Sequence, residues 1–282
     1  MRNRFTAACF LFFALFALAT AHAAVLTSAD APLRLIRGAA VYKAANGVAL
    51  QKDDILESGA GGAQVEAGPD TILALGPQTR VLLDNLPADG RGVMQIVLLQ
   101  GWLKVMDKNG RATVATPALQ LSFANGSAIV HAAEGQDAVF AEEGEQQLTR
   151  LDKQDLKAKG PLKLAAEQHA ALEPGKPLAP GRPPRAFVAA MPPSFRDRLS
   201  RAPDVPKAGK VQPIKERETD FADVQDWLQA SLPARKAFVA RFKPRLADPV
   251  FRKALDGALG QSVDWKPVLH PVKPRINQEK PS

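Results

Sequence analysis

The sequence predicts a mostly β N-terminal domain (a roll, a sandwich or a solenoid-like fold) and a small α-helical C-terminal module after a Pro-rich linker. Three observations support this. Short β-rich runs separated by turn residues fill the chain up to about residue 172. The composition then changes, since 15 of the 20 glycines lie in 24–172 whereas 17 of the 23 prolines follow it. Apolar residues recur at helical spacing from about residue 219.

The β-rich runs recur about every 8 to 12 residues, and several alternate apolar with polar side chains. Turn residues such as Asn46-Gly47 and Asn109-Gly110 lie between them. Parallel strands joined by helices would need longer intervening segments, so a sandwich, barrel or roll is favoured. We expect an all-β domain over residues 32–172, with strands at 33–36, 64–67, 71–75, 80–83, 94–99, 102–106, 112–115, 119–123 and 128–131.

Residues 173–218 form a predicted linker rich in Pro, Lys and Arg. Proline fixes φ and removes an amide donor, so this stretch should be semi-rigid and extended. An apolar island interrupts it at Phe187–Met191 and Phe195–Leu199, and we expect this island to dock on a folded part. Ser194 is placed to cap a short helix there.

Residues 219–266 should form three short amphipathic helices. Thr219 or Asp220 is the expected cap of the first, Ser231 with Pro233 opens the second, and Asp248-Pro249 opens the third, which Gly260 ends. A bundle of this size has a marginal core, so we expect it to pack on the β domain or on a partner. Residues 267–282 are expected to be a disordered tail.

Residues 1–23 have the pattern of a secretory signal peptide. Arg2 and Arg4 precede an apolar stretch over 5–18, and Ala21-His22-Ala23 offers small residues where a signal peptidase cuts. Cleavage after Ala23 would place the mature chain in the periplasm, with no integral membrane segment in it. A retained membrane anchor is the alternative interpretation.

Cysteine content and charge narrow the class of partner. Cys9 is the sole cysteine, so the mature chain should hold no disulfide and no cysteine metal site, which favours a bacterial envelope protein. Residues 24–172 carry 14 Lys and Arg against 17 Asp and Glu, whereas residues 173–282 carry 21 against 12. Export argues against a nucleic acid partner, so this basic region indicates an envelope protein or an anionic envelope polymer, or else a solvated surface without a partner.

The residues that could carry chemistry do not form a recognisable catalytic set. The mature chain has three histidines far apart in sequence, His131, His169 and His270, and contains no HExxH, GxSxG or phosphate-loop motif. We therefore predict a protein that is not an enzyme, with no catalytic, cofactor-binding or metal-binding residues and no cofactor. Asp53, Asp54, Glu142 and Glu143 could form an acid–base pair but are better explained by turn chemistry. Trp102 and Tyr42 could stack on a ligand, or Trp102 could belong to the core.

The order of motifs in the β region resembles the FecR domain, an envelope module named for a bacterial iron-uptake regulator. The opening pattern of that family is matched by residues 50–59, with Asp53 where glycine is usual, and continues at Ala63 and Val65. Residues 70–81 resemble the strand that follows, residues 97–105 resemble the central pattern of two apolar strands around a glycine, and Thr116-Pro117 matches the Thr-Pro of the family. The resemblance covers residues 33–144. A C-terminal pattern around Trp227 and Trp265 is similar to the tail of exported FecR-like proteins.

The resemblance implies a β-rich periplasmic domain that senses or holds a partner without catalysis. The regulator itself has a cytoplasmic anti-sigma segment and a transmembrane helix before this domain, whereas here a signal peptide is expected in that place. We therefore expect a free-standing, non-enzymatic binding, sensing or scaffolding protein of the cell envelope. The alternatives are a binder of anionic cell-wall polymer or lipid headgroups through the basic C-terminal region, and a cell-wall hydrolase, which would require two carboxylates converging in a cleft.

Overall fold

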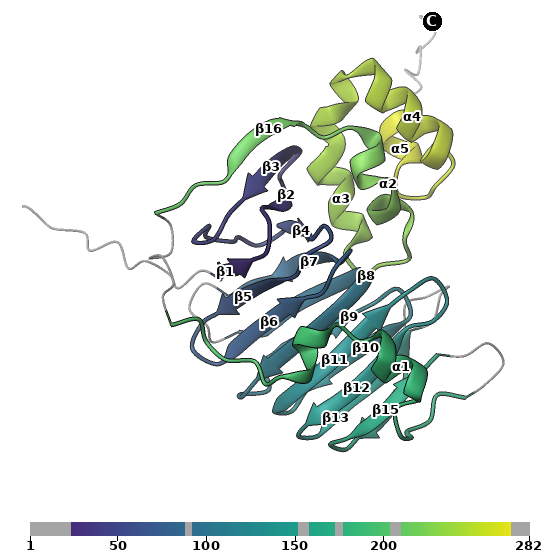
Figure 1. The fold of residues 1–282 in the computed structure, drawn as a ribbon. Helices are drawn as coiled ribbons and strands as arrows, with labels where there is room; N and C mark the ends of the chain where they lie inside the picture. The colour runs from purple at the N-terminus through teal and green to yellow at the C-terminus, as the bar shows by residue number, and fades with distance from the viewer. Residues whose placement is uncertain (1–23, 88–91, 152–157, 173–176, 204–209, 272–282) are drawn as a thin grey trace, which may run out of the picture.

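The computed structural model of the chain describes residues 24–87, 92–151, 158–172, 177–203 and 210–271 (Figure 1). The predicted signal peptide, with Cys9, lies outside the described residues, as does the expected tail from residue 272 onward. The predicted fold class is confirmed, because the chain forms a β-sandwich followed by a group of helices.

Two sheets make the sandwich, and each is mostly antiparallel. Sheet A contains, in spatial order, β1 (Val25–Ala29), β5 (Ala63–Ala67), β6 (Thr71–Leu75), the second half of β8 (Met94–Asp107), β11 (Gly126–Ala132), β12 (Ala138–Glu143) and β15 (Gln168–Ala171). Sheet B contains β16 (Ile214–Glu218), β3 (Ala40–Ala44), β2 (Leu33–Arg37), β4 (Ile55–Glu57), β7 (Arg80–Asn85), the first half of β8, β9 (Ala112–Ala115), β10 (Leu119–Phe123), β13 (Gln146–Leu151) and β14 (Ala158–Leu164). Strand β9 runs parallel to β8.

Strand β8 belongs to both sheets and changes sheet at Gly101. Its first half pairs with β7 and β9, and its second half pairs with β6 and β11. Before Gly101 the even-numbered residues Ile96 and Leu98 face the core, whereas after it the odd-numbered residues Leu103 and Val105 do. The alternation of inward and outward side chains therefore shifts by one residue at the glycine. Gly101 has φ +95, and a Cβ there would lie 2.5 Å from Oγ1 of Thr79, so glycine is required. The two predicted strands 94–99 and 102–106 are therefore one bent strand.

The main core lies between the two sheets and takes side chains from both. Leu35 and Val81 enter it from sheet B, and Val65 and Val130 enter it from sheet A. The opposite face of each sheet is also apolar, because residues such as Ile36 on β2 and Ile129 on β11 are fully buried under other parts of the chain. Burial on both faces explains why strand β6 reads as a continuous buried run.

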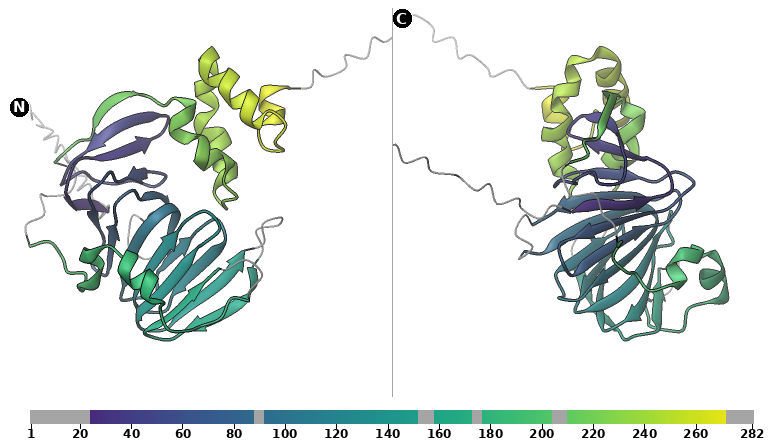
Figure 2. Two further views of the ribbon diagram at one scale, coloured as in Figure 1. Left: turned by 45° about the vertical axis from the view of Figure 1, so that its right-hand side comes forward. Right: turned by 60° about the vertical axis from the view of Figure 1, so that its left-hand side comes forward.

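A helical cover packs on the outer face of sheet B (Figures 1 and 2). It consists of α2 (Phe221–Gln229), α3 (Arg235–Phe242), η2 (Lys243–Ala247), α4 (Pro249–Leu259) and α5 (Lys266–Leu269). Trp227, Phe238 and Phe242 bury themselves against Ile36, Val41 and other sheet B residues. The expectation that this module packs on the β domain is confirmed.

The predicted helix starts are confirmed for two of the three main helices. Asp220 precedes α2, and its backbone N–H donates to the Asp223 carboxylate at 2.7 Å. Asp248 accepts from the backbone N–H of Val250 at 2.9 Å, with Pro249 in the first helical position. The second start is wrong: α3 begins at Arg235 without a side-chain cap, so Ser231 and Pro233 lie in the preceding turn.

A second, thinner cover crosses the outer face of sheet A. This strap, residues 185–203, contains α1 (Arg185–Ala190) and η1 (Pro193–Arg196) (Figure 1). It buries Met191 and Phe195 against Trp102 and Ile129. Docking of the apolar island is confirmed. Ser194 lies inside η1 and caps no helix, so that prediction is wrong.

Three expected boundaries are corrected by strands and a helix at their margins. Strand β1 begins at Val25 and pairs with β5, so the sandwich starts earlier than residue 32. The last part of the expected linker is strand β16, which pairs with β3. Leu269 ends helix α5 and is buried in the helical cover, so the expected tail cannot start at residue 267.

Candidate functional site: a cleft where the two sheets divide

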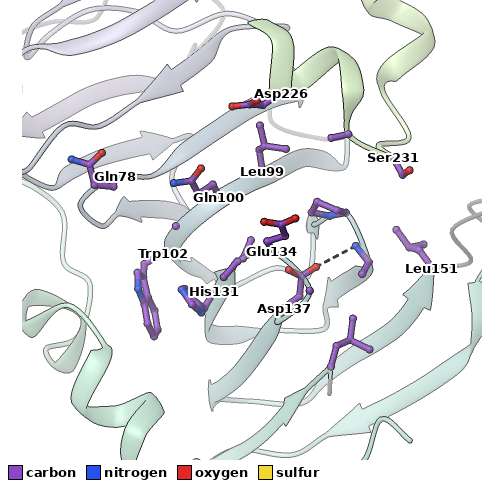
Figure 3. A pocket seen from close by; sticks show the side chains of 18 of the residues that line it. Gln78, Leu99, Gln100, Trp102, His131, Glu134, Asp137, Leu151, Asp226 and Ser231 are labelled. Atoms are coloured by element: carbon purple, nitrogen blue, oxygen red, sulfur yellow. Dashed lines mark hydrogen bonds between the residues drawn. The ribbon is translucent and has the colours of Figure 1, made fainter. Parts of the chain in front are cut away.

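A cleft of about 1600 Å³ opens at the end of the sandwich nearest the helical cover (Figure 3). We name it the fork cleft, because it lies where β9 and β11 separate on either side of Gly101. Its walls come from segments far apart in sequence: 77–78, 99–102, 117–118, 131–135, 150–151 and 226–231, together with Asp137 and Leu172.

The shared strand explains why the cleft opens here. On one edge of β8, strand β9 pairs with residues 94–97 and β11 with residues 101–107. No strand among the described residues pairs with 98–100 on this edge, and Leu99 and Gln100 line the cleft. The gap on the opposite edge is filled: Thr79 Oγ1 accepts from the Trp102 N–H at 3.0 Å, and the Gly76 N–H donates to the Trp102 carbonyl at 2.8 Å.

Uncharged polar side chains face this opening. Gln78, Gln100 and Ser231 line the cleft, and none of these side chains hydrogen-bonds to another residue in the described ranges. Gln78 has φ +52, a left-handed conformation that costs a non-glycine residue about 1 kcal/mol. Gln229 adds a fourth polar group at the end of α2. The cleft therefore offers free donors and acceptors beside an open strand edge.

The carboxylates of the cleft are held apart by their own partners. Asp137 is buried and accepts from the Thr116 hydroxyl at 2.5 Å and from the Ala118 N–H at 3.2 Å (Figure 3). Asp226, on the opposite wall, accepts from Arg80 at 2.5 Å. Glu134 is exposed at the tip of the β11–β12 turn. Two of the three carboxylates thus stabilise the walls.

The sequence-predicted carboxylates do not form a pair across a cleft. Asp54 is fully buried and accepts from two guanidinium nitrogens of Arg37, at 2.8 and 2.6 Å. Glu142 accepts from Lys104 at 2.7 Å on the outer face of sheet A, and Glu143 accepts from Arg198. Asp53 has φ +67, a conformation that suits the glycine usual in the FecR pattern. No cluster of metal-ligating side chains occurs within the described part of the chain.

The aromatic and histidine candidates meet where the strap crosses sheet A. The His131 ring stacks on Trp102 at a centroid distance of 4.1 Å, and Phe187 packs on Trp102 at 5.1 Å and on His169 at 4.6 Å. Trp102 is a core residue of this cluster, and burial lowers the pKa of His131. His131 and His169, which are far apart in sequence, thus contact the same aromatic cluster. His270 instead contacts Asp256 at 2.8 Å, and Tyr42 packs against the main core.

Much of the basic C-terminal region is occupied by internal contacts. Arg217 binds Asp223, which Arg34 also binds, and Arg241 donates to the carbonyls of Gly38, Asp53 and Ile36 at 2.6 to 2.9 Å. Burial lowers the pKa of Arg241 to about 10. Further arginines bind acidic or carbonyl groups at positions 198, 201, 235, 245 and 252. The net positive charge of this region is therefore a poor measure of a free cationic surface.

Comparisons with known proteins do not establish a family. No family model matches the chain, and no curated protein matches it. Two crystal structures of a candidate anti-sigma factor from Parabacteroides distasonis, at 2.50 and 1.65 Å resolution, are similar in structure, each at 14% identity and a TM-score of 0.38. They match 48% of this chain, which spans 62% and 63% of those chains, less than two thirds of their length. At this similarity they carry no argument about function.

Among the described residues, none of the helices is both long and apolar enough to span a bilayer.

Proposed function

We propose that this chain is a non-enzymatic, FecR-like binding or scaffolding protein of the bacterial cell envelope, and that the fork cleft holds its partner. The observation that carries the proposal is the combination, in one large cleft, of an open edge of β8 with the unpartnered polar side chains of Gln78, Gln100 and Ser231. Polar side chains that converge on a concavity can hydrogen-bond a ligand in place of solvent.

The cleft favours binding over hydrolysis. Hydrolysis of a glycosidic bond needs one carboxyl group kept protonated and a second one placed opposite it. Asp137 and Asp226 are instead hydrogen-bonded to Thr116 and Arg80, which leaves Glu134 on an exposed turn. The FecR-like motifs of the sequence point in the same direction.

A periplasmic location is part of the proposal. Cleavage after Ala23 would leave strand β1 complete, since β1 begins at Val25 and pairs with β5. Mass spectrometry of the protein recovered from an osmotic-shock fraction tests this location. We expect the mass of a chain that begins at Ala24. A chain that retains residues 1–23 and stays in the cytoplasm would contradict this location.

Photo-crosslinking in intact cells tests the binding role. A crosslinking residue replaces Gln229, which is exposed in the cleft wall, and in a matched variant it replaces Gln95, an exposed residue of β8 outside the cleft. We expect a discrete adduct from position 229 and none from position 95. Equal labelling from both positions, or none from either, would contradict the proposal. Deleting residues 173–282 is a poor test, because it would expose the apolar outer face of sheet B.

The alternative function, binding of an anionic polymer through the basic region, has less support because so many of its arginines bind internal groups. It predicts steep weakening of sacculus binding as ionic strength rises.

A further inference from the structure

Among the described strands, one edge of β8 is unpaired over three residues at the fork cleft. Residues 98–100 lie between the end of the β9 pairing at Val97 and the start of the β11 pairing at Gly101. The corresponding gap on the other edge is closed by the Thr79 hydroxyl and Gly76. On the cleft side no hydrogen bond from the described residues closes the gap, so a short row of backbone groups is available for strand pairing.

Resting on the proposed binding function, we infer that the fork cleft binds an extended, positively charged peptide segment of a partner protein, which pairs with the edge of β8 at Leu98–Gln100. An edge strand presents N–H and C=O groups at the spacing of a peptide backbone, and added strands use this pairing in many peptide-recognition domains. A cleft of about 1600 Å³ exceeds the roughly 300 to 1000 Å³ usual for small-molecule sites and suits a polymer segment.

The aromatic residues argue against a sugar ligand. Carbohydrate sites generally present the open face of an aromatic ring. The lining residue Trp102 is stacked on His131 and covered by Phe187, and it is only 9% exposed. It therefore has no free face for a pyranose ring, whereas the half-buried Leu99 offers an apolar contact to the side chains of a peptide.

The charge of the lining favours a cationic segment. Glu134, Asp137 and Asp226 are the acidic lining residues, against the single cation Arg150. Arg80 offsets Asp226, and Glu134 has no hydrogen-bonding or ionic partner in the described residues. Glu134 is thus the carboxylate best placed to receive a Lys or Arg side chain.

The probe for this inference is a phage-displayed library of random dodecapeptides, selected on the mature chain alone. The enriched peptides are then measured on the Gln100→Trp variant, whose side chain fills the cleft from an exposed position. We expect enriched peptides rich in Lys or Arg. Their affinity should fall at least about tenfold in Gln100→Trp and in Gln229→Trp, which fills the cleft from the opposite wall, and should be unchanged in the matched control Gln95→Trp.

Backbone pairing is tested with two N-methylated forms of an enriched peptide. One form is methylated at the odd-numbered residues and the other at the even-numbered residues. Methylation removes N–H donors, and only one of the two sets of N–H groups faces β8. Methylation of that set should weaken binding about tenfold, and methylation of the other set should have a small effect. The Glu134→Lys substitution should lower the affinity for basic peptides and leave the affinity for uncharged peptides unchanged. Circular dichroism of each variant verifies its folding.

Several results would overturn the inference: no enrichment, peptides that bind Gln100→Trp equally well, indifference to both methylation patterns, or displacement by chitohexaose. The cell crosslinking experiment separates the two proposals. An adduct from position 229 without peptide binding would leave the binding function standing and remove the peptide ligand, whereas loss of both results would remove both.

Discussion

The two outer faces of the sandwich are covered in different ways. On sheet B, helices α2 to α5 bring their own aromatic core, in which Trp227, Phe238 and Phe242 are buried. On sheet A, the strap buries only Met191 and Phe195 and is held by Lys104, whose ammonium group donates to Glu142 and to the carbonyls of Phe195 and Asp197 at 2.7 to 2.8 Å.

The difference indicates that the two covers contribute differently to stability. The helical cover shares a continuous apolar core with sheet B, so its removal should unfold the sandwich cooperatively. The strap buries two apolar side chains, and its other ties to sheet A include polar contacts of Lys104, Arg198 and Arg201. It should therefore open locally while the sheets stay folded. Each of the following experiments could break this distinction.

The largest effect is expected from Trp227→Ala. The Trp227 side chain is fully buried under sheet B, so its truncation should lower the free energy of unfolding by about 3 to 5 kcal/mol. Urea unfolding followed by circular dichroism measures this, with Val250→Ala, at a position 76% exposed, as a control that should change stability by less than about 0.5 kcal/mol. A small loss for Trp227→Ala would mean that the helical cover is not part of the cooperative unit.

Asp223→Asn should have the next largest effect. Arg34 and Arg217 both bind this carboxylate, and only 9% of its side chain is exposed. Burial alone would raise the pKa of Asp223, but the Arg217 and backbone hydrogen bonds outweigh it and hold the pKa below its ordinary value. We expect a loss of about 2 kcal/mol, less than for a fully buried pair, because both arginines are partly exposed. The wild-type advantage should diminish as the pH falls through the carboxyl range, and a pH-independent difference would contradict this account.

Lys104→Met should loosen the strap far more than the two sheets. The substitution removes the donor shared by Glu142 and two strap carbonyls, and we expect a global loss of about 1 to 2 kcal/mol. Hydrogen exchange should rise sharply over residues 185–203 and little in sheet B. Lys108→Met, at an exposed position after the same strand, is the control. Uniformly faster exchange in both sheets would show that the strap is as integral as the helical cover.

The smallest effect should come from His131. Burial holds its pKa below the ordinary value near 6.5, so the unfolded chain binds the proton more readily than the folded one. Stability should therefore decrease modestly as the pH falls below about 6.5 and remain constant above it. The quenching of Trp102 fluorescence by the stacked ring reports the change, and His131→Gln should reduce this acid sensitivity.

The sequence predicted the strands and helices that carry strong periodic signals. Residues 71–75 and 119–123 were predicted with their observed boundaries, because their β-forming residues are bounded by turns. Strand β12 was missed because Ala and Glu dominate it, and β16 because Lys, Glu and Arg fill an exposed edge. Such strands are specified by their neighbours and not by their own composition.

The candidate site was less accessible from the sequence. The residues of the fork cleft carry no shared motif, since Gln78, Gln100 and Ser231 come together only when β8 changes sheet at Gly101. The family-like pattern of two apolar runs around that glycine was visible in residues 97–105. The change in which residues face the core, and the unpaired edge of β8, could not be predicted, because both depend on which strands pair with β8 on its two edges.

Strand β16 makes the completion of sheet B depend on the C-terminal part of the chain. The first hairpin, β2 with β3, is completed on its outer edge only by a strand made far later. Until that strand and the helices after it are available, the hairpin exposes an unpaired edge beside the apolar side chains of Ile36 and Val41. Contacts this distant in sequence form slowly, so we expect the N-terminal third of the chain to be prone to self-association while the rest is being made.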